Sequence, residues 1–326
     1  MSSSGQRVRS FRWWSSSPPS AAVAIDAGRV VGVSMGRSAD GPVVSRQAAE
    51  PVAAGVVTPA LAQHNVSDPD ALAGAVGRVL DQIGRPRRVG LVVADSAAKV
   101  SLVRFEKLPS RASDLEQLVR WQVRKAVPFP IEAAQLSWSP GTQTGQGREL
   151  VVTVMRRDVV EEYEAACLRH GAHAGVVDIA TFNLVNLVLA ADARERGQAP
   201  AQGDWLLVSL VHDYSALAIV RGTDLIFYRY RPAGAEEPLA DLVHQASMYY
   251  EDRLGGHALS RVVICGGEAA REGGLDALRE AVSSRWQCRT EVLDVRRIAP
   301  KADGGQVAPE VWSALAPAIG LVLRGA

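Results

Sequence analysis

The sequence lacks several features that would define a function class at once. No window reaches about 18 uninterrupted apolar residues, the length that a membrane-spanning helix needs, and residues 1–20 lack the apolar core of a signal peptide. The 36 Lys and Arg nearly cancel the 35 Asp and Glu, which leaves a formal net charge of +1 in 326 residues. Because nucleic-acid binding needs clustered, uncompensated positive charge, we expect no nucleic-acid partner.

Cysteine is also scarce. The three cysteines, Cys167, Cys265 and Cys288, lie far apart in apolar surroundings. Their spacing fits neither a zinc site nor a disulfide framework, and it favours a reducing, cytosolic environment. No Gly-Lys-Ser or Gly-Lys-Thr occurs, which excludes a Walker A phosphate loop. We therefore expect no metal site.

Two short patterns resemble catalytic motifs but lack the context that those motifs need. Gly32 to Gly36 fits G-x-S-x-G with Ser34 as the nucleophile, yet the residues that follow do not begin the helix that a nucleophile elbow requires. His212 and Asp213 are adjacent, so they point to different sides of a strand or span a turn, where Asp is common. The sequence therefore disfavours a hydrolase, and we assign no catalytic residue.

Residues 1–20 form a basic and aromatic leader. It contains three arginines and two tryptophans and no acidic residue. These residues are Arg7, Arg9, Arg12, Trp13 and Trp14. An anionic membrane interface or an acidic partner would attract basic residues beside tryptophan. In the alternative interpretation, the leader has no such partner and contains the two tryptophans by chance.

From residue 21 the pattern alternates strands and helices. Residues 21–37 predict two strands around a tight turn that begins at Asp26, in which Gly28 can adopt a positive φ. Residues 68–84 predict a helix, and residues 89–95 predict a buried strand.

The residues that follow this strand predict a strand, a helix, a strand, a helix and a strand, in that order. Its first helix has a capping box formed by Ser113 and Glu116 and ends at Pro128-Phe129-Pro130. Residues 141–147, rich in Gly, Gln and Thr, are expected to be a loop.

The second half repeats the opening pattern. After a polar break at 191–204, residues 205–232 predict strand, turn, strand, turn and strand, and a long helix follows at 238–254. A buried strand then leads into Gly266-Gly267. The closing apolar helix contains Pro317, where it should bend or restart. This repetition predicts a duplicated α/β fold whose halves could clamp a nucleotide between their hairpins.

Four blocks of sequence resemble the PilM family, actin-like cytoplasmic proteins of type IV pilus assembly. In the family's order, they are LPSRASDLEQLVRWQVRKAVPFPIEAAQLSW, VVDIATFNLVNLV, SRVVICGGEA and LAPAIGLVLRG. The resemblance covers nearly the whole chain from Ala21. The cytoplasmic domain of GspL in type II secretion is similar to the same family.

The resemblance implies an actin-like, FtsA-like fold, that is, a duplicated ribonuclease H-like α/β ATPase fold with a small inserted α+β subdomain. The implied parts are a flexible leader, the start of the first actin-like subdomain, the inserted subdomain, a crossover helix with linker, and a second half with a reduced fourth subdomain. Their ranges are 1–20, 21–94, 95–178, 179–200 and 201–326.

The resemblance also implies a cytoplasmic scaffold peripheral to the inner membrane. Such a scaffold would hold the N-terminal cytoplasmic peptide of a PilN-like membrane protein and couple it to pilus motor or platform proteins. The implied peptide groove lies between the first actin subdomain and the inserted one. Its candidate residues are Leu108, Pro109, Trp121, Pro128, Phe129 and Pro130. In the alternative interpretation, Trp121 and Phe129 are core residues of the inserted subdomain.

The nucleotide motifs of the family are altered. Asp26 and Gly28 are present, but Arg29 stands where Ser and Thr usually follow to cradle phosphate. Ser209 begins the second hairpin motif in place of Asp, and Glu268 occupies a position that is usually small. We therefore expect a degenerate nucleotide cleft, no enzyme activity and no cofactor. An ATP-binding protein with Mg²⁺ and slow or regulatory hydrolysis is the alternative. The cleft candidates are Asp26, Gly28, Arg29, Gly266 and Gly267.

Overall fold

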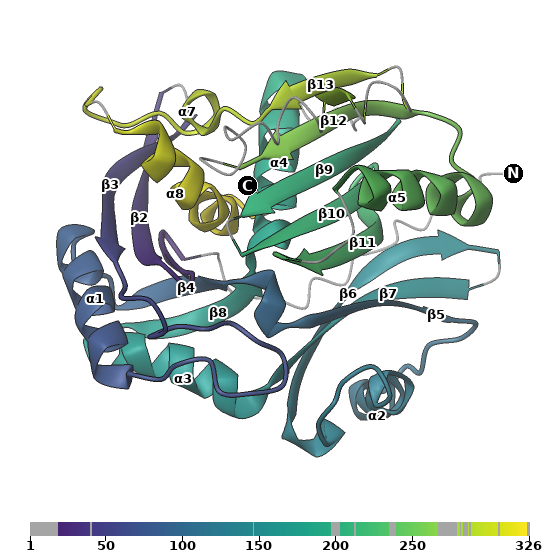
Figure 1. The fold of residues 1–326 in the computed structure, drawn as a ribbon, viewed down its shortest axis with the longest axis horizontal. Helices are drawn as coiled ribbons and strands as arrows, with labels where there is room; N and C mark the ends of the chain where they lie inside the picture. The colour runs from purple at the N-terminus through teal and green to yellow at the C-terminus, as the bar shows by residue number, and fades with distance from the viewer. Residues whose placement is uncertain are drawn as a thin grey trace, which may run out of the picture.

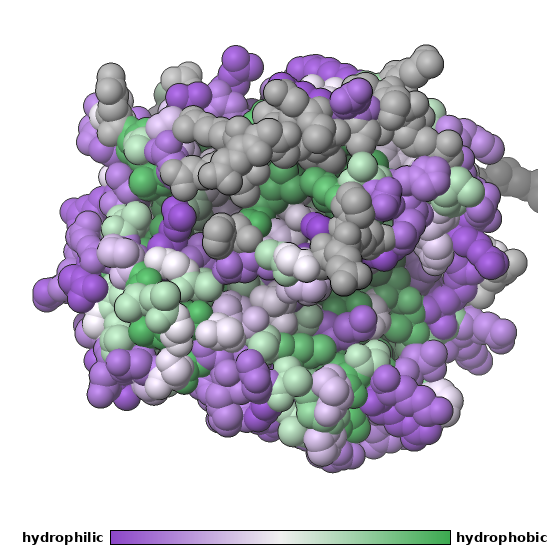
Figure 2. Space-filling model, in the orientation of Figure 1, coloured by the Kyte–Doolittle hydropathy of each residue, from purple (hydrophilic) through white to green (hydrophobic). Residues whose placement is uncertain are grey.

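The computed structural model describes most of the chain, and all structural statements below concern this part. The described residues are 19–39, 41–145, 147–196, 203–211, 213–234, 239–266, 279–280, 282, 286, 288–305 and 307–324. They form two five-stranded sheets and one three-stranded sheet, with helices between and around them (Figure 1). None of the described helices is long and apolar enough to cross a membrane. Toward the centre of the face in Figure 2, apolar residues show between polar ones.

The first sheet has the strand order β3-β2-β1-β4-β8. Its strands are β1 (Ala21–Ile25), β2 (Arg29–Ser38), β3 (Gly41–Pro51), β4 (Arg88–Val93) and β8 (His173–Ile179). The hairpin predicted at the start of the chain is confirmed, because β1 pairs antiparallel with β2 and Ile25 lies opposite Val30. The positive φ expected at Gly28 is wrong, since the Asp26 side chain closes the turn by accepting from the backbone amides of Gly28 and Arg29. Alternate residues of β1 face opposite layers, so the strand is buried on both sides.

Helices cover both faces of this sheet. Helices α1 (Pro69–Gln82) and α3 (Arg157–Leu168) pack on the face that carries Val23 and Ile25. Helix α8 (Pro309–Val322) packs on the face that carries Ala22. The predicted α1 is confirmed, with the Asp68 side chain accepting hydrogen bonds from the first helical amides.

The second sheet repeats this layout in the order β11-β10-β9-β12-β13. Its strands are β9 (Asp204–Val211), β10 (Tyr214–Arg221), β11 (Asp224–Pro232), β12 (Leu259–Cys265) and β13 (Arg289–Val292). Helix α5 (Leu239–Leu254) covers one face, and α4 (Ala180–Arg196) packs with α8 on the other. In both sheets two antiparallel pairs are followed by two parallel pairs, which confirms the duplication.

The third sheet belongs to the inserted subdomain and has the order β5-β7-β6. Its elements are β5 (Lys99–Phe105), α2 (Ala112–Val123), β6 (Ala134–Thr144) and β7 (Gly147–Arg156). Leu115, Val119 and Val123 of α2 pack on one face of the sheet. The other face contributes Val100 and Val151 to the core of the first half. The sheet therefore lies between α2 and the rest of the molecule (Figure 1).

Two local expectations for this subdomain are wrong. Residues 141–144 are part of strand β6, which pairs with β7, rather than a loop. The capping box does not form, because α2 begins at Ala112 and places Ser113 inside its first turn, where its hydroxyl bonds Asp114.

The three-stranded sheet spans a shorter range than the 95–178 expected for the insert. It ends at Arg156. Helix α3 and strand β8 follow it and return to the first half, where β8 pairs parallel with β4. The short helix η1 (Asp95–Ala97) precedes the insert, and η2 (Ile131–Ala133) lies within it.

Helices α4 and α8 cross closely beneath the junction of the two halves. A Cβ added to Gly320 of α8 would lie 1.9 Å from the backbone oxygen of Asn183 on α4. Helix α8 runs through Pro317 as a single element instead of restarting there. The short helix α7 (Val295–Ile298) precedes it, and the intervening segment pairs with the β3 edge, where Val44 N donates to Pro300 O at 2.9 Å.

Candidate functional site

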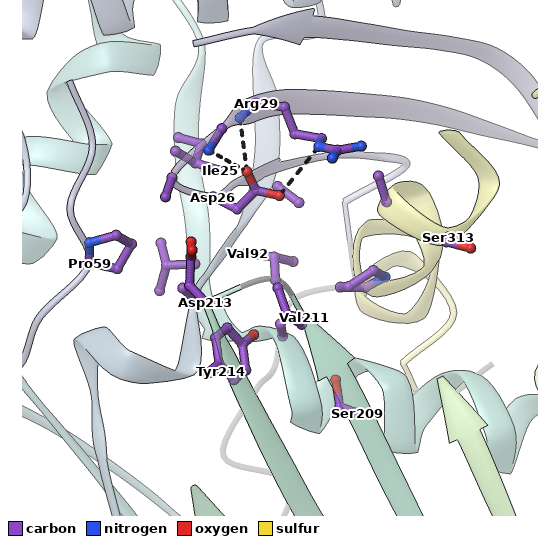
Figure 3. Close-up of a pocket in the computed structure, with 18 of the residues that line it drawn as sticks. Ile25, Asp26, Arg29, Pro59, Val92, Ser209, Val211, Asp213, Tyr214 and Ser313 are labelled. Atoms are coloured by element: carbon purple, nitrogen blue, oxygen red, sulfur yellow. Dashed lines mark hydrogen bonds and ion pairs between the residues drawn. The ribbon is translucent and has the colours of Figure 1, made fainter. Parts of the chain in front are cut away.

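A cavity of about 810 Å³ lies between the two halves, where the carboxyl ends of β1, β4, β9 and β12 meet. The first hairpin forms one wall, and the second hairpin forms the opposite one (Figure 3). The loop after β3, the start of α4, the segment from Val292 to Val295 and helix α8 complete the described lining. In open α/β sheets, ligands bind at the carboxyl ends of strands, so this cavity is the first candidate for a binding site.

The turn of the first hairpin is closed by its own carboxylate. Asp26 Oδ1 accepts hydrogen bonds from Gly28 N at 2.9 Å and from Arg29 N at 2.8 Å. Asp26 Oδ2 lies 3.8 Å from Arg29 Nε. Burial raises the pKa of Asp26 above its ordinary value, although the two amides and Arg29 act in the opposite direction. Two amides that could face an anion are therefore already hydrogen-bonded within the chain.

The second hairpin presents a different set of groups. Ser209 is 1 % exposed and lines the cavity, and its hydroxyl has no hydrogen-bond partner among the described residues (Figure 3). Asp213 is exposed at the turn, where its charge contributes to the raised pKa of Asp26. His212 lies outside the described residues. A serine thus occupies the place in β9 where the family resemblance leads one to expect a carboxylate.

The candidate glycine at the end of β12 has a packing role. A Cβ on Gly266 would lie 2.7 Å from the Leu210 carbonyl oxygen and 2.9 Å from Leu210 Cβ. The absence of a side chain at Gly266 therefore lets the chain leaving β12 pass close to β9. Gly267 and Glu268 lie outside the described residues.

A buried carboxyl group that the sequence analysis missed lies behind the cavity. Asp95 is fully buried at the start of η1, accepts a hydrogen bond from Thr181 N at 3.1 Å and is also bonded to the Thr181 hydroxyl. Tyr214 of the second hairpin packs in a buried cluster with Ala94, the residue before Asp95. Burial raises the pKa of Asp95 to about 7, although the bonds to Thr181 oppose this shift. This cluster ties the second hairpin to the first half of the molecule.

The lining is poor in positive charge. Of its residues that the structure describes, Arg29 is the only Lys or Arg, whereas three are acidic: Asp26, Asp213 and Glu310. No group of three potential metal ligands is found in the described part of the chain. Ser34 is not set up as a nucleophile, because it lies within β2 and donates a hydrogen bond to Ile83 O at 2.7 Å.

The candidate groove residues of the insert are not all in one environment. Trp121 is 57 % exposed, and the Arg124 guanidinium lies 5.1 Å from its ring centroid. Since Val119 faces the sheet, helical spacing places Trp121 on the opposite side of α2, away from the first half. Trp121 is therefore not a core residue.

The other candidates flank α2. Leu108 and Phe129 are half-buried and pack against the core beneath this helix. Pro109 is half-buried, whereas Pro128 and Pro130 are exposed. Trp121 therefore does not share a groove between the first subdomain and the insert with the half-buried residues. Arg7, Arg9, Arg12, Trp13 and Trp14 of the leader lie outside the described residues.

Comparisons with known proteins agree with the resemblance seen in the sequence. The model of the family described as type IV pilus assembly protein PilM matches residues 23–253. A structure of the PilM-PilN type IV pilus biogenesis complex has a chain that superposes with a TM-score of 0.77 at 18 % identity, covering 94 % of this chain and 98 % of that one. The expected actin-like α/β fold is thereby confirmed.

Two other solved structures are more distant. The cytoplasmic domain of EpsL, an inner-membrane component of the type II secretion system of Vibrio cholerae, gives a TM-score of 0.46 at 14 % identity, over 75 % of this chain and 80 % of that one. A Bacteroides thetaiotaomicron protein with an actin-like ATPase fold gives 0.47 at 6 % identity, over 86 % and 91 %. No curated protein matches the chain by sequence.

Proposed function

The chain belongs to the family of the type IV pilus assembly protein PilM, and from this premise we propose that it is a non-enzymatic scaffold of type IV pilus assembly. In this role it binds the N-terminal cytoplasmic peptide of a PilN-like inner-membrane protein. The observation that supports the proposal most is the superposition over almost the full length of both chains on a structure from the PilM-PilN complex. A type II secretion-like system is the alternative setting.

We place the peptide contact on the inserted subdomain. Trp121 is exposed and stacked by Arg124, and these two residue types are enriched among the residues that dominate binding energy at interfaces. Pro128 and Pro130 are exposed just beyond the end of α2, with the half-buried Phe129 between them. The side chains of Leu108 and Phe129 support this surface from beneath through the core of the insert.

Isothermal titration calorimetry tests the proposal directly. The purified chain is titrated with a synthetic peptide of the N-terminal cytoplasmic segment of the PilN-like protein from the same organism. We expect saturable one-to-one binding and none with a scrambled peptide. Absence of binding to the native peptide would rule out the scaffold assignment in this form.

We propose further that the nucleotide cleft is degenerate. The amides of Gly28 and Arg29 are bonded to Asp26. Ser209 offers a neutral hydroxyl in place of a metal-binding carboxylate, and acids outnumber cations in the described lining. A triphosphate with its Mg²⁺ needs free donors and compensating charge, so the residues present do not fit it.

ATP binding is the second candidate function. The supporting observation is the cavity of about 810 Å³ at the junction of the two halves, with Asp26 and Gly28 on its wall. A thermal-shift titration with MgATP distinguishes the two. A ligand at a hundredfold excess over its Kd adds about 2.7 kcal/mol of stability, so an unchanged melting temperature would exclude this second function.

In this role the protein is cytoplasmic and is held peripherally at the inner membrane, where it contacts pilus motor or platform proteins. We propose that the Arg and Trp residues of the leader contribute to the membrane attachment. Flotation with anionic vesicles, comparing the full chain with a variant lacking residues 1–17, tests the leader. Equal flotation of the two proteins would refute its contribution.

A further inference from the structure

We propose that the cleft between the two halves binds an uncharged, largely apolar small molecule in place of a nucleoside triphosphate. This inference extends the proposed degeneracy of the cleft and states which ligand the changed cleft accepts. It does not depend on the peptide contact made by the inserted subdomain.

The cavity is held open by contacts that need no ligand. Backbone hydrogen bonds join β3 to the segment before α8, where Val44 N donates to Pro300 O and Ala302 N donates to Val44 O, both at 2.9 Å. On the opposite side, Tyr214 of β10 packs in a buried cluster with Ala94, which follows β4. A preformed cavity lowers the cost of ordering the protein around a ligand.

The walls of the cavity are mainly apolar. At about 810 Å³ the cavity falls in the range of roughly 300–1,000 Å³ that is usual for small-molecule sites. The apolar residues on several of its elements include Ala24, Val31, Val92, Leu184, Leu210 and Leu293. A ligand that buries apolar surface against these side chains gains the hydrophobic contribution, whereas a polyphosphate would lose its hydration without compensation.

The charges at the mouth of the cavity disfavour an anion. Asp26 and Asp213 interact across the two hairpins, and each would repel a phosphate. Arg29, the single cation of the described lining, lies 3.8 Å from the Asp26 carboxylate, which weakens its attraction for an anion. The amides of the first turn are bonded to the same carboxylate and are not free to donate to a phosphate.

Ser209 supplies one specific polar contact. It is 1 % exposed, it points into the cavity in Figure 3, and no described residue hydrogen-bonds to its hydroxyl. A buried hydroxyl is normally paired, so this group is available to a hydrogen-bonding atom of the ligand. The ligand class is therefore an apolar body with a neutral polar group that reaches β9.

The test uses the full chain and a series of probes that differ in charge: adenosine, AMP, ADP and ATP, each with Mg²⁺. Adenosine is expected to bind, and the affinity is expected to fall with each phosphate, by at least tenfold in total. The uncharged dye Nile red serves as a second probe, whose fluorescence should rise on binding and fall when adenosine competes. Tighter binding of MgATP than of adenosine would overturn the proposal, as would binding of neither adenosine nor Nile red.

A matched pair of variants locates the site. Ser209→Ala should lower the affinity for adenosine roughly three- to tenfold through loss of one hydrogen bond. Ser260→Ala, in the same sheet but outside the cavity lining, should leave the affinity unchanged, because the Ser260 hydroxyl donates to Asp204 O at 2.9 Å. Equal effects of the two variants would contradict the role of Ser209. Peptide binding by the parent protein is measured in the same experiment, and its absence would report a failure of the scaffold proposal rather than of the cleft ligand.

Discussion

The cleft and the outer face of the inserted subdomain differ in how their candidate residues are used. In the cleft, Asp26 closes its own turn and Gly266 makes room beside Leu210, so the fold itself accounts for both residues. On the insert, Trp121 is 57 % exposed and contributes nothing to the core beneath α2. The candidate nucleotide-site residues Asp26 and Gly266 therefore have structural roles in the fold, whereas the exposed Trp121 has none in the core beneath α2. The comparison predicts that changes in the cleft alter stability and that changes on the insert alter peptide affinity.

The largest effect should come from the helix crossing beneath the cleft. Gly320→Ala places a Cβ where the backbone oxygen of Asn183 lies 1.9 Å away, so α4 and α8 must separate. We expect a loss of about 3 kcal/mol or more in the free energy of unfolding, measured by urea denaturation. The control Gly74→Ala, in α1 with only an Arg78 side chain at 3.6 Å, should stabilise by up to about 1 kcal/mol. Equal stability of Gly320→Ala and the parent would contradict the packing described here.

The next effect concerns the pH dependence of stability through Asp95. Its pKa is raised from 3.8 to about 7, so the native state binds more protons than the unfolded state between these values. The contribution of Asp95 to the free energy of unfolding has its full value below pH 3.8 and is lost as the pH rises toward 7. For one proton, the loss between pH 5 and pH 7 is about 2 kcal/mol.

Asp95→Asn isolates this contribution because asparagine is neutral at every pH. The difference in unfolding free energy between the parent and the variant should change by the same amount between pH 5 and pH 7, with the variant favoured at the higher pH. Curves that run parallel would show that Asp95 titrates normally. Peptide affinity should be the same for both proteins at each pH.

On the insert, Trp121→Ala should weaken peptide binding by roughly thirtyfold, or about 2 kcal/mol, as for a residue that dominates an interface. Its free energy of unfolding should stay within about 0.5 kcal/mol of the parent, because the side chain is exposed. Calorimetry and urea denaturation measure the two quantities. Gln117→Ala, an exposed residue one turn earlier on α2, is the matched control and should change neither.

The smallest effect should come from the first hairpin turn. Asp26→Ala removes the acceptor for Gly28 N and Arg29 N and should cost about 1 kcal/mol of stability. Asp26→Asn keeps an acceptor oxygen and should recover most of this loss. If Asp26→Ala instead lowered the affinity for the peptide without affecting the melting temperature, the assignment of separate roles to the cleft and the inserted subdomain would be wrong.

Much of the fold could be predicted from local patterns. The hairpin at Asp26 and the helix after Asp68 each begin at an aspartate whose side chain accepts hydrogen bonds from the amides two and three residues further on, so the sequence alone indicates them. Strand β6 could not be predicted in this way, because its exposed residues are polar and turn-forming, and its pairing with β7 decides its conformation.

The site depends more on distant contacts. Asp95 and Thr181 are 86 residues apart, and only the fold brings them together. The position of Asp95 two residues after the buried strand β4, at the carboxyl end of the sheet, was the pattern that could have indicated it. The packing of Gly266 on Leu210 and the outward position of Trp121 likewise depend on how the strands and α2 are placed, which the motifs do not specify.

The most direct test of this account is one calorimetric titration of the PilN-like peptide into four proteins: the parent, Trp121→Ala, Asp26→Ala and Ser209→Ala. We predict tight binding to the parent and to both cleft variants, a roughly thirtyfold loss for Trp121→Ala, and no change on adding MgATP. Equal affinity of Trp121→Ala and the parent, or loss of binding in the cleft variants while they remain folded, would contradict the separation of the peptide surface from the cleft.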